Sequence, residues 1–96
     1  MKFKSEKVNH QNMFAIGKDL VRDEYIMTIT VCGIAWYDRY FSISQEEFEL
    51  YDEDRDEFMK IYYHCMRSGS GSYRFLCSDK INENAQSDLD RLREGK

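Results

Sequence analysis

The chain has 96 residues, which is enough for one domain with a small hydrophobic core and excludes a large enzyme with separate cofactor and substrate domains. A hydrophobic content of 42% argues against intrinsic disorder, although 33% of the residues are charged. The formal net charge of −4 argues against nucleic acid as a partner, because phosphate backbones repel an acidic surface, and it favours a basic protein partner instead.

The first half of the chain predicts an antiparallel meander of three strands. Residues 1–12 are polar and predict a loose N-terminal arm or an edge segment, and the apolar run after them predicts a strand over 13–20. Residues 25–36 are rich in β-branched and aromatic side chains, which makes them the strongest strand signal in the chain. A hairpin turn is then expected at 37–39, with the third strand returning over 40–43.

The middle of the chain predicts helix. Ser44 is followed three residues later by Glu47, which fits a capping box, so a helix is expected to begin at the residue after Ser44. The acids at 52–54 either interrupt this helix or cap a second one, and an amphipathic apolar stripe continues over 58–65. The Gly/Ser-rich residues 68–72 then predict a flexible loop.

The last part of the chain predicts one more strand and one more helix. Residues 73–77 alternate and are β-prone, and Ser78 is expected to cap the final helix. The apolar positions of that helix are Ile81, Ala85, Leu89 and Leu92. The order β-β-β-α-(α)-β-α predicts a single α+β domain over 1–96, with an antiparallel sheet of about four strands and two or three helices packed on one face.

The cysteines and the N-terminus indicate a reducing compartment. Cys32, Cys65 and Cys77 are odd in number and lie among apolar neighbours, which predicts buried free thiols. The N-terminus lacks the apolar core of a secretory signal, and no apolar run is long enough to cross a bilayer as a helix. We therefore expect a cytoplasmic protein with no membrane partner.

The sequence carries no motif for catalysis or metal binding. It has no Cys-x-x-Cys or His-x-x-x-His pair, no Gly-x-Ser-x-Gly elbow and no complete phosphate-binding loop. The alternate acids from Asp52 to Asp56 have the spacing of a calcium loop, but no Gly follows at the sixth position. We expect no catalytic residue, metal or cofactor; an enzyme that uses Cys65 or Cys77 is the least favoured alternative, because no activating partner can be placed.

Residues 45–57 contain eight acidic residues and one basic residue, Arg55. The simplest interpretation is a solvated helix face. However, packing like charges destabilises a small domain, and a basic partner would offset that repulsion. Aromatic residues flank the run, a composition typical of protein-binding hot spots. The predicted partner-binding residues are Tyr37, Tyr40, Glu46, Glu47, Glu49, Tyr51, Asp52, Asp54 and Asp56.

The aromatic residues divide into two expected groups. A domain of this size needs large side chains to fill its core, and we assign Phe48, Phe58 and Phe75 to that role. We expect Tyr37, Tyr40 and Tyr63 to be exposed and available to a partner.

The segment Trp36 to Tyr51 has the pattern W-Y-x-x-Y-F-x-I-S-x-E-E-F-E-L-Y, in which a hairpin leads into an acidic helix. In this arrangement the chain resembles the small acidic immunity proteins encoded beside bacterial polymorphic toxins, including those of contact-dependent inhibition systems. The resemblance implies a non-enzymatic cytoplasmic protein that neutralises a cognate toxin by covering its active site. Nucleases are among the toxins that such proteins neutralise. The alternative is a small homo-oligomeric regulatory or structural domain, for example a homodimer formed through an exposed strand edge.

Overall fold

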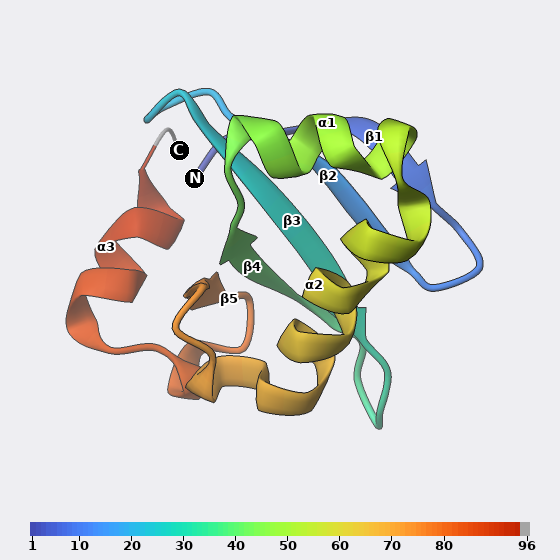
Figure 1. Cartoon of the computed structure of the whole chain (residues 1–96). Helices are drawn as coiled ribbons and strands as arrows, with labels where there is room; N and C mark the ends of the chain where they lie inside the picture. Colours follow the sequence, from blue (N-terminus) through green and yellow to red (C-terminus); the bar gives the residue numbers. More distant parts are fainter. Residues whose placement is uncertain (95–96) are drawn as a thin grey trace.

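The structure is a computed structural model that describes residues 1–94 (Figure 1). Five antiparallel strands form one sheet in the order β1-β2-β3-β4-β5, so each strand lies beside the next strand along the chain. This confirms the α+β class, with one strand more than expected. The elements are β1 (Phe3–Asn9), β2 (Phe14–Asp19), β3 (Glu24–Val31), β4 (Tyr37–Ser42), α1 (Gln45–Glu53), α2 (Arg55–Ser68), the 3-10 helix η1 (Gly69–Gly71), β5 (Phe75–Ser78), the 3-10 helix η2 (Ile81–Glu83) and α3 (Gln86–Arg93).

The N-terminal residues form the edge of the sheet. Of the two alternatives for residues 1–12, the structure has the edge segment, since β1 pairs with β2 along its length. A β-bulge between Ser5 and Lys7 interrupts the register. The backbone of β1 comes so close to Gly17 that a Cβ there would lie 1.9 Å from the carbonyl oxygen of Lys4. Glycine at position 17 is therefore required by the close approach of the two strands.

The β3–β4 hairpin differs from the sequence prediction. The strong strand ends at Val31, and the turn expected at 37–39 lies instead at 32–36. Val31 pairs with Tyr37 and Thr30 with Asp38, and the Thr30 hydroxyl donates to Asp38 Oδ1 at 2.7 Å. The apolar character of 32–36 favoured a strand, but these residues lie in the turn and are exposed, so burial does not explain their composition.

Two capped helices follow the sheet meander. The capping box is confirmed, because Glu47 N donates to Ser44 Oγ at 3.1 Å and Ser44 N donates to Glu47 Oε1 at 2.8 Å. Directly after α1, Asp54 caps the N-terminus of α2, because its Oδ1 accepts a hydrogen bond from Glu57 N at 3.2 Å. Of the two alternatives for the acids at 52–54, the structure therefore has the second helix.

The main core lies between the sheet and the first two helices, which cross the sheet in Figure 1. Because side chains alternate along a strand, Met27 and Ile29 of β3 face this core, while Ile26 and Thr28 face the other side. Helix α3 stands apart from α1 and α2, beside β5 (Figure 1), and Arg91 of α3 reaches Glu24 at 2.8 Å. The core residues are Phe14, Ile16, Met27, Ile29, Phe41, Ile43, Tyr51, Phe58, Tyr62 and Cys65.

In the C-terminal third, the Gly/Ser-rich segment expected as a flexible loop contains the 3-10 helix η1, and its Gly69 is buried at a φ of 53°, with Arg39 packed against it. The expectation for Ser78 is wrong. Ser78 ends β5 and does not cap the last helix, which begins only at Gln86. The reason is Asn84, whose side chain exchanges hydrogen bonds with the backbone N and O of Ser78, each at 2.8 Å.

Within residues 1–94, no helix has both the length and the apolar character needed to cross a membrane.

Candidate protein-binding surface

Four carboxylates of the acidic run form an exposed surface, which we call the acidic face: Glu46, Glu49, Glu53 and Asp56. The first three follow one another at steps of three and four residues, so they lie on one side of α1. The fourth lies in the first turn of α2. None of the four has an ion-pair partner among residues 1–94. A basic protein surface would supply the missing counter-charges.

The other acids of the run serve the fold. Glu47 accepts two hydrogen bonds from the guanidinium of Arg74, at 2.8 and 2.5 Å. Asp52 pairs with Lys7 of β1 at 2.7 Å, and Asp54 caps α2. Partial burial disfavours the charge on Glu47, but the hydrogen bonds from Arg74 and Ser44 outweigh it and lower the pKa of this carboxyl. Glu47, Asp52 and Asp54, all predicted as partner contacts, have internal partners, and of the three only Asp52 and Asp54 are exposed.

The prediction that Tyr51 contacts a partner is wrong. Its side chain is only 5% exposed and lies in the core, with its ring in edge contact with Phe14 and Phe58. The guanidinium carbon of Arg55 lies 3.6 Å from the centre of the Tyr51 ring. The helical period explains the burial, because position 51 falls on the side of α1 opposite the acidic face. Tyr51 therefore has no surface to offer a partner.

Tyr37 and Tyr40 are half-buried, and their hydroxyls are already bound. Tyr37 donates to Glu83 Oε2 at 3.0 Å, and Tyr40 donates to Asp79 Oδ1 at 3.1 Å. Burial is the main cause that raises the pKa of both tyrosines, with the nearby carboxylates adding to it. These two hydroxyls anchor the segment after β5 to β4, so the expectation of exposed, available tyrosines is wrong for both.

Arg39 of β4 binds the same carboxylate, Glu83, that accepts from Tyr37. Its guanidinium binds Glu83 through Nε to Oε1 at 2.9 Å and Nη2 to Oε2 at 2.6 Å. These hydrogen bonds are the main cause that lowers the pKa of Glu83 to about 2. Because both groups have their charges satisfied within the chain, this pair joins β4 to η2.

The remaining aromatic expectations are met in part. Phe58 is fully buried as expected, while Phe48 and Phe75 pack against the core but are partly exposed. Tyr63 is 54% exposed, as expected. Sequence reasoning missed the exposure of Ile34 and Trp36, at 111% and 66%, in the β3–β4 turn, which projects beyond the sheet in Figure 1. Only the register of the hairpin identifies them as turn residues.

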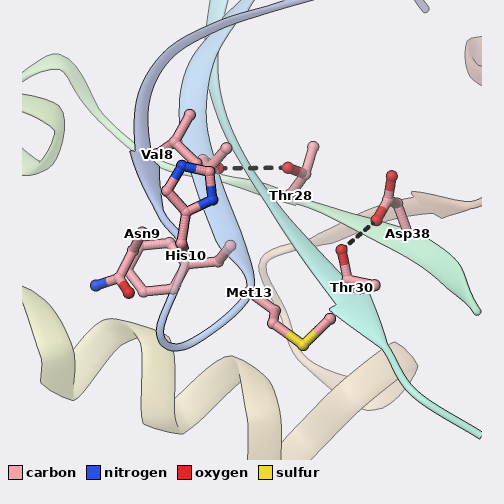
Figure 2. Close-up of a pocket in the computed structure, with 9 residues that line it drawn as sticks. Val8, Asn9, His10, Met13, Thr28, Thr30 and Asp38 are labelled. Carbon is pink, nitrogen blue, oxygen red and sulfur yellow. Dashed lines mark hydrogen bonds between the residues drawn. The ribbon is translucent and has the colours of Figure 1, made fainter.

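A hollow of about 320 Å³ lies on the sheet face opposite the main core (Figure 2). Figure 2 shows His10 at one side and the Thr30 hydroxyl directed at Asp38 on the other. Thr28 donates to Ala15 O, although at 3.5 Å this contact is weak. Thr30 and Asp38 satisfy each other, and His10 lies on the opposite side of the hollow, so these polar groups do not converge on a common point. Within residues 1–94, no group of three or more His, Cys, Asp or Glu side chains is placed to hold a metal ion.

The cysteines do not share one environment. Cys65 and Cys77 are buried, as expected, but Cys32 is exposed in the β3–β4 turn, so that expectation is wrong. Burial raises the pKa of Cys65 to about 11 and that of Cys77 to about 12. Both buried sulfurs are therefore neutral thiols near pH 7, and the thiolate is the nucleophilic form of cysteine.

No family model, curated protein or solved structure matches the chain.

Proposed function

We propose that the chain is a non-enzymatic binding protein whose acidic face contacts a basic protein partner. The observation that carries this proposal is the selective pairing of the acids. Glu47, Asp52 and Glu57 form ion pairs within the chain, whereas the four carboxylates of the acidic face have no ion-pair partner among residues 1–94. Unpaired like charges on adjoining helical turns destabilise the isolated domain, and a basic partner removes that cost.

We further propose that this partner is a bacterial toxin domain and that the chain is its cytoplasmic immunity protein. Support comes from the resemblance of the segment 36–51, in which a hairpin leads into an acidic helix. A toxin that acts on nucleic acid needs a basic substrate cleft, since it must hold phosphate groups. An acidic face placed over such a cleft would exclude the substrate and speed association by electrostatic attraction.

The test is charge reversal on the acidic face, with a co-encoded toxin domain as the proposed binding partner. Glu49→Lys should slow association roughly tenfold at low salt, and added salt should reduce the difference. Asp90→Lys makes the same charge change on an exposed residue of α3 and should have little effect. Affinity that is independent of salt and unchanged by Glu49→Lys would contradict the proposal and leave the acidic face as a solvated surface.

Edge strand β1 is the surface on which the homo-oligomeric alternative would depend. This strand is one edge of the sheet, so its outer backbone groups lack a strand partner among residues 1–94. Its bulge and the charged side chains of Lys4, Glu6 and Lys7 are features that natural edge strands use against pairing. Sedimentation equilibrium distinguishes the two proposals. Self-association of the parent protein that is lost in Ser5→Pro would favour the homo-oligomer.

A further inference from the structure

An apolar stripe runs along α2 from the acidic face to the β3–β4 hairpin; it is partly buried at Met59 and exposed at Tyr63 and Met66. Met59, Tyr63 and Met66 follow at steps of four and three residues, so their side chains lie on one side of the helix. Tyr63 is 54% exposed and Met66 is 49% exposed. The stripe begins one turn after Asp56, and the distance from Asp56 to Met66 is about 15 Å of helix.

The stripe ends in a hollow of about 410 Å³, to which four separate parts of the chain contribute. Its apolar lining, which we call the apolar hollow, is formed by Met13, Val31, Cys32, Tyr62 and Met66. Met13 comes from the β1–β2 turn, and its sulfur lies 3.6 Å from the Cys32 sulfur at the base of the hairpin. These contacts join the walls, so the hollow exists in the free protein.

The Tyr62 hydroxyl and the Arg39 guanidinium, which both line the apolar hollow, already have partners within the chain. The Tyr62 hydroxyl donates to Asn12 O at 3.0 Å, and Arg39 is held by Glu83. The hollow therefore offers apolar contact area without an unpaired charge that a ligand would have to match. Ile34 and Trp36 lie in the same turn as Cys32 and are exposed, so they add apolar surface at this end of the molecule.

We propose that the apolar hollow receives an apolar side chain from an amphipathic segment of the same basic partner. Charge complementarity fixes the orientation: the basic end of the segment lies over Glu53 and Asp56, and its apolar end lies over Met66. The spacing of about 15 Å matches a helical segment of about three turns. This inference rests on the proposed function for the charge of the partner and adds the apolar anchor that charge alone does not provide.

The test uses a synthetic helical peptide with lysines at one end and leucines at the other, and a matched peptide with the leucines replaced by serine. Met66→Gln, which removes apolar surface without adding charge, should weaken binding of the leucine peptide about tenfold. Ile81→Gln replaces an equally accessible apolar side chain on η2, 55% exposed, and should have little effect. The serine peptide should bind weakly and be insensitive to Met66→Gln.

A second measurement requires no substitution. Because Cys32 lines the apolar hollow and is exposed, the bound leucine peptide should slow its alkylation severalfold, while the serine peptide should not. Equal effects of the two peptides, absence of binding, or equal effects of Met66→Gln and Ile81→Gln would overturn the inference. If Glu49→Lys weakens the leucine peptide while Met66→Gln does not, the inference fails and the proposed function stands. The reverse result contradicts the proposed function, and with it the orientation set by charge, and supports only the apolar anchor.

Discussion

Arg74 grips Glu47 with two parallel hydrogen bonds, Nη1 to Oε1 at 2.8 Å and Nη2 to Oε2 at 2.5 Å, and thereby ties the chain before β5 to the first turn of α1. The same guanidinium also donates to Ser42 O at 3.0 Å, so it joins β4, α1 and the approach to β5. Both side chains are largely buried, with 16% and 22% exposure. The most acidic segment of the chain is thus anchored by one of its own acids.

Glu47→Gln should lower the free energy of unfolding by about 1–2 kcal/mol, because it removes a charge-assisted pair and weakens the capping box. Urea denaturation measures this change. Glu46→Gln is the matched control, since Glu46 is exposed, and it should shift stability by no more than about 0.5 kcal/mol. Equal effects of the two substitutions would show that the Arg74 pair contributes nothing.

Acid should unfold the protein partly through Glu83. Its pKa falls from 4.5 to about 2 in the folded state, chiefly through hydrogen bonds from Arg39. A lowered folded-state pKa gives stability that is present above pH 4.5 and is lost as the pH falls toward 2. Glu83→Gln should therefore be less stable than the parent at pH 7, by about 2 kcal/mol, with the difference shrinking below pH 4.5. A pH-independent difference in urea midpoints would contradict this.

Tyr51→Ala should destabilise the fold by about 3 kcal/mol, since it leaves a cavity beside Phe14 and Phe58. Tyr73→Ala, at a tyrosine that is 80% exposed, should change stability by less than about 0.5 kcal/mol. Thermal unfolding checks both. A small effect of Tyr51→Ala on stability, together with weakened partner binding, would show that Tyr51 contacts the partner.

The three thiols should react at very different rates. Cys32 is exposed and should react readily with a thiol reagent in the native protein. Cys65 and Cys77 are buried and their pKa values are raised, so they should react only when the protein unfolds. Mass spectrometry of partly alkylated protein, with and without urea, measures the order. Native labelling of Cys65 at the rate of Cys32 would show that α2 opens readily from the sheet.

Replacing Cys65 and Cys77 by Ala should lower stability, because each substitution removes a buried sulfur from a packed interior. Partner binding by the folded variant should be retained, since neither thiol reaches the surface. Binding measured at a temperature well below the unfolding transition separates the two effects. Loss of binding in a well-folded variant would favour a catalytic role for these thiols.

The sequence by itself determined the features whose causes lie within a few residues. The capping box of Ser44 and Glu47 is a pair of local hydrogen bonds between neighbours in the chain, whereas the sequence left open whether Asp54 caps a second helix. The strand at Phe14–Asp19 and the α+β class also follow from local patterning. These features depend on backbone geometry that a short segment specifies on its own.

Only the tertiary structure decided which acids and aromatics are available to a partner. The helical period places Glu49 and Tyr51 on different sides of α1, but the sheet that packs on one side buries Tyr51. Glu47 is occupied because folding brings Arg74 to it across 27 positions of sequence. Long-range contacts of this kind depend on how strands and helices pack together, which the pattern of any single segment does not specify.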